Sequence, residues 1–83
     1  MDQMIIHFTK KAYKQYKKLP AAYKKLLNAV LEKLQNSVQI DILPVQGETN
    51  TYRIRIGKYR IIIIKTNEVI LVVKIESRGD VYK

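Results

Sequence analysis

The clearest periodic pattern in the chain is helical and lies in its N-terminal half. From position 23 onward, the large apolar side chains follow the i, i+3, i+4, i+7 spacing that places them on one face of an α-helix. These residues are Tyr23, Leu26, Leu27, Val30, Leu31 and Leu34. A narrower stripe of Tyr13, Tyr16 and Leu19 among lysines predicts a basic helix over residues 10–19. Pro20 ends this first helix and can open the second, so an antiparallel helical hairpin with a tight junction is expected.

A different pattern, with a period of two, characterises the C-terminal third. Residues 52–56 alternate apolar and arginine side chains until Gly57 and Lys58 interrupt the run, which is typical of a β-hairpin. Residues 59–65 and 69–76 are two further β-favouring runs, separated by a short polar turn. The three runs together predict a three-stranded antiparallel meander.

The remaining segments give weaker signals. Residues 4–8 favour a short strand that stops at Thr9, a good helix N-cap. Residues 35–50 have little periodicity and include a proline and a glycine. They are therefore interpreted as a connection, with at most a short extended piece around residues 38–43.

The predicted fold class is α+β: a short N-terminal strand, an antiparallel helical hairpin, and then a three-stranded antiparallel meander forming a twisted sheet packed on the helices. The chain of 83 residues is expected to form a single domain, residues 1–83, with one compact core. It has no cysteine, so neither disulfides nor thiolate metal sites are expected. Its apolar runs are far shorter than the roughly 18 residues of a membrane span, and no secretory signal is apparent. We therefore expect a cytoplasmic location and no membrane partner.

Pairing across the hairpin places three arginines together. A two-residue turn would set Arg55 opposite Arg60 and Arg53 opposite Ile62. The apolar residues then face the helices, and the three arginines share the other face of the sheet, here termed the outer face, with Ile62 and Ile64. No acidic residue is expected beside these arginines, termed the arginine cluster. Directly opposed like charges are destabilising by a few tenths to about 1 kcal/mol per pair. The arrangement therefore indicates an anion-binding surface, the alternative being a solvated face that keeps the chain in solution.

The charge distribution agrees with this interpretation. The net charge is +9, which favours a polyanionic partner. Residues 1–50 hold eight lysines and no arginine, whereas residues 51–83 hold four lysines and all four arginines. The lysines are expected to form a solvated helix face that adds affinity without specificity. The guanidinium group of arginine matches phosphate oxygens and can stack on bases, so the arginines are the better candidates for a site.

The hairpin carries a resemblance to a known family. Residues 52–61, Tyr-Arg-Ile-Arg-Ile-Gly-Lys-Tyr-Arg-Ile, resemble the YRIRxGxYRI hairpin of the RelE/ParE superfamily of type II toxins. The short N-terminal strand, the helical hairpin and Gly47 ahead of the β-hairpin agree with this family. The closing residues 77–82 are similar to its HRxxVY ending. The resemblance covers essentially the whole chain.

For RelE-like members, the resemblance implies a metal-independent endoribonuclease without a cofactor. Such a toxin enters the ribosomal A site and cleaves mRNA, which inhibits translation. The resemblance assigns the catalytic site to Arg53, Arg55 and Arg60 of the sheet and to Arg78 and Tyr82 of the tail. It also implies a cognate antitoxin that neutralises the toxin, with operator DNA bound only through the toxin–antitoxin complex.

One departure from the family concerns acid–base chemistry. Many ribonucleolytic relatives carry a histidine before the tail arginine, and here that position is Ser77. The only histidine, His7, lies on the expected first strand and is interpreted as a structural or surface residue. The 2′-hydroxyl of RNA can attack the adjacent phosphate if a proton acceptor, a proton donor and charge stabilisation are supplied. The acid and base roles stay open between Arg78 and Tyr82.

Two other functions fit the same residues. A ParE-like toxin would share the fold and inhibit DNA gyrase without cleaving nucleic acid. A non-catalytic relative would bind nucleic acid through its basic sheet and carry out no chemistry. Both alternatives stay open at this point.

Overall fold

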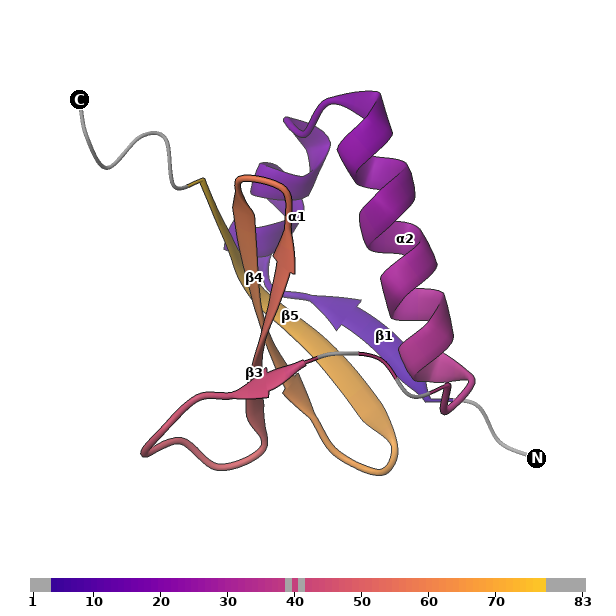
Figure 1. The fold of residues 1–83 in the computed structure, drawn as a ribbon, viewed down its shortest axis with the longest axis vertical. Coiled ribbons are helices and arrows are strands. Elements are labelled where there is room, and N and C mark those ends of the chain that lie inside the picture. Colours follow the sequence, from indigo (N-terminus) through magenta and orange to yellow (C-terminus); the bar gives the residue numbers. More distant parts are fainter. Residues whose placement is uncertain (1–3, 39, 41, 78–83) are drawn as a thin grey trace.

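The computed structural model describes residues 4–38, 40 and 42–77. Its elements are, in chain order, β1 (Ile5–Phe8), α1 (Lys10–Lys17), α2 (Ala21–Gln35), β2 (Leu43–Pro44), β3 (Thr51–Ile56), β4 (Tyr59–Lys65) and β5 (Val69–Ser77). The described strands form a five-stranded sheet in the order β1-β5-β4-β3-β2. Both helices lie on one face of this sheet (Figure 1). The predicted α+β fold is confirmed.

The predicted meander is present, and two further strands extend it. Strands β3, β4 and β5 pair antiparallel, with Arg55 opposite Arg60 and Arg53 opposite Ile62 as expected. Strand β1 pairs with β5 in parallel, and β2 adds a two-residue edge beside β3. A parallel pair needs a long crossover connection, which here consists of everything between β1 and β5.

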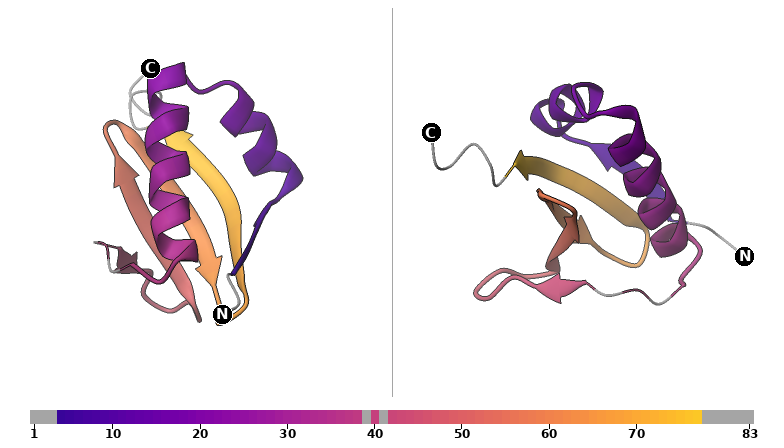
Figure 2. Two further views of the ribbon diagram at one scale, coloured as in Figure 1. Left: turned by 90° about the vertical axis from the view of Figure 1, so that its right-hand side faces the viewer. Right: turned by 45° about the horizontal axis from the view of Figure 1, so that its top comes forward.

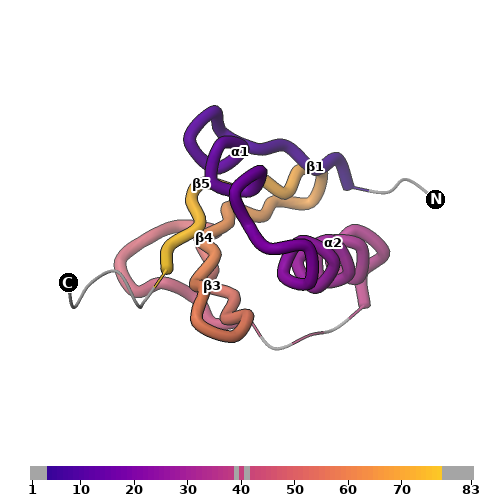
Figure 3. The backbone as a smooth tube through the Cα atoms, turned by 90° about the horizontal axis from the view of Figure 1, so that it is seen from above, coloured from indigo at the N-terminus to yellow at the C-terminus, as the bar shows by residue number. Residues whose placement is uncertain are grey.

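The two helices run in opposite directions across the inner face of the sheet, the face toward the helices. Figure 2 shows α2 crossing in front of the strands, and Figure 3 shows α1 beside β1 and β5. The side chain of Thr9 caps α1, and Pro20 is the N-cap residue of α2. Neither described helix has the length and apolar character needed to cross a membrane.

The core lies between α2, α1 and the inner face of the sheet. Its most deeply buried side chains are Leu27, Ile61, Ile63, Ile70 and Val72. Leu26, which the spacing assigns to the apolar stripe, is 51% exposed instead. Its neighbour Leu27 points into the core, and because successive residues of a helix point about 100° apart, Leu26 points away from the core. Tyr13 is exposed in the same way, and Ala12 takes the buried position on α1.

A β-bulge reverses the side-chain alternation in the middle of β5. The register shifts so that Val73 is the extra residue, with Val72 and Lys74 pairing on either side of it. Val72 faces the core before the bulge and Ile75 faces the core after it. Without the shift, Lys74 and Glu76 would continue the alternation of Val72 and point into the core.

Side chains of the α1 segment complete the hydrogen bonding of β5 beyond the end of β1. The hydroxyl of Thr9 accepts from the backbone N–H of Ala12 at 3.0 Å and donates to the carbonyl oxygen of Val73 at 2.7 Å. The side-chain oxygen of Gln15 accepts from the backbone N–H of Ile75 at 2.8 Å. The first helix is therefore fixed to β5 at the bulge itself.

Candidate functional site

The outer face of the sheet carries the arginine cluster. Arg53 and Arg55 come from β3 and Arg60 from β4, and the observed register sets Arg55 and Arg60 directly opposite each other. Arg55 is exposed, whereas Arg53 and Arg60 are half-buried. Opposed cations repel each other across an antiparallel pair. A bound anion would remove this repulsion, because it would be shared by both guanidinium groups.

The side chain of Arg60 adds a second indication of an anion site. Its Nε atom is buried and has no hydrogen-bond partner among the described residues. Buried polar groups in folded proteins are nearly always paired, and an exception calls for a physical reason. An acceptor oxygen from a ligand on the outer face would satisfy this donor if the Arg60 side chain turned outward to meet it, because the Nε atom is buried as it stands.

The structure corrects the expectation that no acidic residue lies beside the cluster. Glu76 of β5 is directly opposite Arg60, so the row Arg55, Arg60, Glu76 crosses three adjacent strands. Glu76 forms an ion pair with Lys74 at 3.3 Å rather than with Arg60. Both side chains of this pair keep about two fifths of their surface exposed. The cluster is therefore a mixed site, with one carboxylate at its border.

The bulge in β5 explains why the sequence pattern did not place Glu76. Regular alternation from Val72 would have assigned it to the core side of the sheet, and the extra residue Val73 turns it outward. The signal available in the sequence was the pair of charges at Lys74 and Glu76 after a continuous apolar run. Two charges at alternate positions cannot share a buried face, so they mark a change of face.

The tail residues Arg78 and Tyr82 lie outside the described residues. Strand β5 ends at Ser77, which is opposite Tyr59 beside the hairpin turn. The last described residue of β5 is therefore at the same end of the sheet as the arginine cluster. The structure brings Arg53, Arg55 and Arg60 together, and the positions of the two tail residues stay predictions.

The hairpin turn beside the cluster is held by an aromatic contact with α2. Gly57 has a positive φ of +58°, and a Cβ atom built there would be 2.7 Å from Cε1 of Tyr23. The Tyr23 ring packs edge-on against Tyr59, with 4.8 Å between ring centroids. Because the turn connects Arg55 to Arg60, this contact fixes the part of the hairpin that presents both arginines.

The outer face also carries apolar side chains: Leu43 of β2 and Ile62 of β4 lie on either side of Arg53, and Ile64 lies farther from the arginines. Ile62 and Ile64 of β4 are half-buried, and Ile64 lies opposite Leu71 of β5. At the two edges of the sheet, Ile5 and Leu43 are 56% and 57% exposed. His7 also lies here on exposed β1, opposite Leu71 and away from the arginines. The predicted surface role of His7 agrees with this position.

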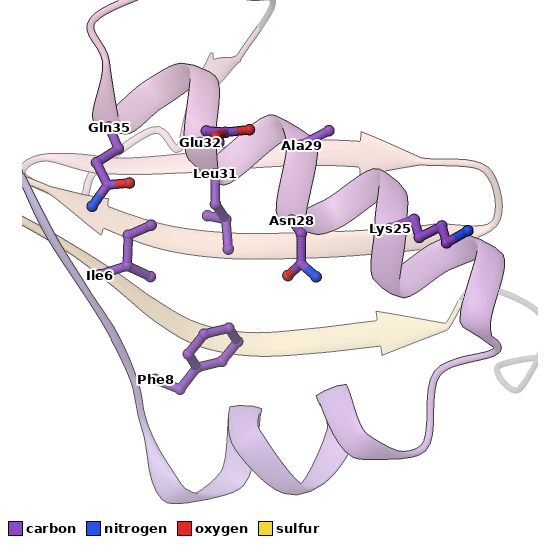
Figure 4. Close-up of a pocket in the computed structure, with 8 residues that line it drawn as sticks. All are labelled: Ile6, Phe8, Lys25, Asn28, Ala29, Leu31, Glu32 and Gln35. Atoms are coloured by element: carbon purple, nitrogen blue, oxygen red, sulfur yellow. The ribbon is translucent and has the colours of Figure 1, made fainter.

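A groove on the helical side of the sheet is separate from the arginine cluster. It has a volume of about 510 Å³ and runs between α2 and β1. Figure 4 shows Ile6 and Phe8 reaching from β1 toward Leu31 and Asn28 of α2. The amide of Gln35 closes one end by donating to the carbonyl oxygen of Met4 at 2.7 Å. A ligand in this groove would not touch the arginines, because the sheet lies between them.

The lysines of the helices form a separate basic surface. Seven of them are exposed, namely Lys10, Lys11, Lys14, Lys17, Lys18, Lys25 and Lys33. Lys17 lies over the ring of Tyr13 at 5.0 Å and Lys24 over the ring of Tyr16 at 5.9 Å. No acidic residue occurs between residues 4 and 31. This surface fits a sequence-independent attraction to polyanions.

Comparison with known proteins gives consistent matches along the chain. A family model described as the ParE toxin of type II toxin-antitoxin system, parDE, matches residues 6–82. The chain is 32% identical over 84 residues to Toxin RelE3 of Methanocaldococcus jannaschii, covering 95% of this chain and 96% of that protein. A chain in the crystal structure of the RelB-RelE antitoxin-toxin complex from Methanococcus jannaschii is 31% identical, with a TM-score of 0.77 and coverage of 92% and 94%. The isolated E. coli RelE toxin shares the fold, with a TM-score of 0.79 at 24% identity and coverage of 95% and 90%.

Proposed function

This chain belongs to the RelE/ParE superfamily of type II toxin–antitoxin toxins, and from that premise we propose that it is a ribosome-dependent endoribonuclease. It would enter the ribosomal A site in the cytoplasm, cleave mRNA and so inhibit translation. The relatives reported above include RelE toxins. The site residues are those predicted from the sequence: Arg53, Arg55, Arg60, Arg78 and Tyr82.

The observation that carries this proposal is the geometry of the arginine cluster. Arg55 and Arg60 face each other on one sheet surface, and the Nε donor of Arg60 is buried without a partner among the described residues. Guanidinium groups that share one sheet surface suit a phosphate group, which offers several acceptor oxygens at once. Such donors also stabilise the extra negative charge that a phosphate gains during in-line attack.

The proposed reaction uses the RNA as its own nucleophile. The 2′-oxygen attacks the adjacent phosphorus, the bond from phosphorus to the 5′-oxygen breaks, and a 2′,3′-cyclic phosphate and a 5′-hydroxyl result. Arg53, Arg55 and Arg60 hold the phosphate and stabilise its charge. Arg78 and Tyr82 assist proton transfer and base stacking from the tail. The guanidinium groups supply the positive charge that a metal ion supplies in metal-dependent enzymes, so the proposed reaction uses no cofactor.

The proposed protein partner is a cognate antitoxin. A structural relative of this chain was solved as a RelB-RelE antitoxin-toxin complex. An antitoxin that binds only the folded toxin would also stabilise this small fold by mass action. Operator DNA would be bound only by the toxin–antitoxin complex, as the family resemblance implies.

A second candidate function is inhibition of DNA gyrase. The observation that favours it is the family match itself, because the matched family is described as the ParE toxin. In this case the arginine cluster would contact protein or DNA and would not cleave RNA. A ribonuclease should leave the supercoiling activity of gyrase unchanged, whereas a ParE-like toxin should abolish it.

The deciding experiment mixes purified protein with ribosomes programmed with a defined mRNA and maps the new 5′ ends. The wild-type protein is expected to cleave the message. Arg60→Ala should cleave about 10²- to 10³-fold more slowly, the usual effect of removing one charge-stabilising donor. Tyr82→Phe tests the tail in the same assay. Lys33→Ala, which removes one positive charge from an exposed position on α2, should cleave at the wild-type rate.

The outcomes separate the candidate functions. Intact mRNA with the wild-type protein contradicts the ribonuclease proposal. If gyrase supercoiling is lost under the same protein concentrations, the ParE-like function replaces it. If both assays are negative and RNA binding is retained, the chain is a non-catalytic relative.

A further inference from the structure

A carboxylate lies at the border of the cationic site. Glu76 is the one acidic residue of strands β3, β4 and β5. The other acidic residues that the structure describes, Glu32, Glu48 and Glu68, are on α2 or in connections away from the arginines. The position of Glu76 is created by the bulge at Val73, so it is a consequence of the fold and not of regular strand alternation.

Glu76 is close enough to the arginine cluster for one bound nucleotide to contact both. It is the direct neighbour of Arg60 on the adjacent strand, and Arg60 is the direct neighbour of Arg55. Adjacent strands are about 4.8 Å apart, so the row spans roughly 10 Å. A nucleotide is comparable in size to this row. If its phosphate lies between Arg55 and Arg60, the ribose can lie over Glu76.

The surroundings of Glu76 keep its carboxylate accessible. The side chain is 43% exposed and contacts Lys74 through Oε2 at 3.3 Å. It also borders a groove of about 350 Å³ that includes Lys18, Lys58 and Tyr59. The charged groups that face it are therefore Arg60 and Arg55 across the strands, Lys74 on its own strand, and these two groove lysines.

The chemistry of RNA self-cleavage requires a proton acceptor. Guanidinium and ammonium groups ordinarily carry their proton at neutral pH, as does the hydroxyl of tyrosine. An ionised carboxylate is the type of side chain that can accept a proton under these conditions. Among the described residues of the cluster and its border, only Glu76 is of this type.

We propose that Glu76 is the general base of the ribonuclease reaction, an inference that rests on the function proposed above. Its carboxylate takes the base role that was left open above between Arg78 and Tyr82: it accepts the proton from the 2′-hydroxyl while the 2′-oxygen forms its bond to phosphorus. The bond from phosphorus to the 5′-oxygen breaks, and the departing 5′-oxygen takes a proton from water. The hydroxide left behind is neutralised by the proton held on Glu76, which restores the carboxylate. Arg55 and Arg60 stabilise the charge on the phosphate throughout.

A purely electrostatic role for Glu76 predicts a change in substrate binding without a fall in kcat. A negative charge beside a phosphate site repels the phosphate, so its removal should tighten substrate binding and lower KM. A general base predicts in addition a large fall in kcat. The two quantities together therefore distinguish a catalytic carboxylate from one that merely balances charge.

The test measures cleavage of programmed mRNA by wild-type protein, Glu76→Gln, Glu76→Asp and a control, Glu68→Gln. The control makes the same change of charge in the exposed turn at the other end of β5. Glu76→Gln is expected to lower kcat by about 10²-fold or more with KM unchanged or lower. It should also lose the decrease in rate on the acid side of the pH profile, which arises from protonation of the base. Glu76→Asp should recover part of kcat, and Glu68→Gln should match the wild type. Thermal melts of all four proteins check that each is folded.

The possible failures are distinguishable. If the wild-type protein cleaves and Glu76→Gln retains the same kcat and pH profile, Glu76 is not the base and the ribonuclease function stands. If Glu76→Gln and Glu76→Asp both lose activity together with their thermal transitions, the residue is structural and the proposal is wrong. If the wild-type protein leaves mRNA intact, both the proposed function and the proposed role of Glu76 are wrong.

Discussion

Replacing Gly57 by alanine should destabilise the protein more than the same change at Gly47. Both glycines have a positive φ, +58° and +80° respectively, and a side chain in the left-handed region costs roughly 1–2 kcal/mol. A Cβ at Gly47 would meet nothing within 4 Å, whereas at Gly57 it would be 2.7 Å from Cε1 of Tyr23 and 3.0 Å from its hydroxyl oxygen. The two sites therefore differ mainly in this overlap.

The overlap at Gly57 can be given an approximate magnitude. To accept a Cβ, the ring of Tyr23 must move from its edge-on contact with Tyr59, whose centroid is 4.8 Å away. Such aromatic pairs contribute about 0.5–1.5 kcal/mol beyond area burial, and overpacking typically costs about 1–3 kcal/mol. We expect Gly57→Ala to cost about 1–3 kcal/mol more than Gly47→Ala. For a domain of this size, each kcal/mol lowers Tm by about 4–8 °C.

The assay is thermal or urea unfolding of both variants, repeated in a Tyr23→Ala background. Removing the ring removes the overlap, so Gly57→Ala should cost less in that background than in the wild type, and Gly47→Ala should cost the same in both. Equal costs of Gly57→Ala in the two backgrounds would falsify the contact as the cause. Because the turn joins Arg55 to Arg60, the single variant should also bind RNA more weakly at a temperature where it is folded.

Three further predictions concern the core, the bulge and the partner. Leu27→Ala should cost about 2–5 kcal/mol in urea unfolding because Leu27 is fully buried, while Leu26→Ala should change stability by less than about 0.5 kcal/mol. Thr9→Ala removes the cap of α1 and the bond to Val73 and should cost about 1–3 kcal/mol, with Thr9→Ser restoring most of it; no loss in Tm would contradict this. A cognate antitoxin at 100 times its Kd should add about 2.7 kcal/mol of stability, seen as a higher Tm, and an unchanged Tm would argue against binding.

The parts of the fold that the sequence predicts are those fixed by local periodicity. The apolar stripe that contains Leu27 and Leu31 predicted α2. The alternation of apolar and arginine residues before Gly57 predicted the hairpin and its register. In both cases the interacting residues are close in the sequence, so one pattern holds the information. The arginine cluster followed from the hairpin register alone.

The parts that were missed depend on contacts between distant segments. Strand β1 pairs with β5, more than sixty residues later in the chain. The four residues of β1 contain no pattern that identifies the strand with which they pair. The bulge at Val73 is stabilised by Thr9 from the start of α1, a contact that no pattern within β5 reveals. Since the bulge decides which way Glu76 points, the carboxylate of the site was missed for the same reason.

The register that builds the core also creates the charge repulsion of the site. Ile54 pairs with Ile61 and both are buried, so the next pair along the hairpin, Arg55 and Arg60, must share the outer face. A shift of the register by one residue would relieve the repulsion only by turning the isoleucines out of the core. Burying a side chain of this size contributes about 1.5–3 kcal/mol, whereas the opposed cations cost at most about 1 kcal/mol. The core therefore decides the register, and the two arginines stay opposite each other on the outer face even though their charges repel.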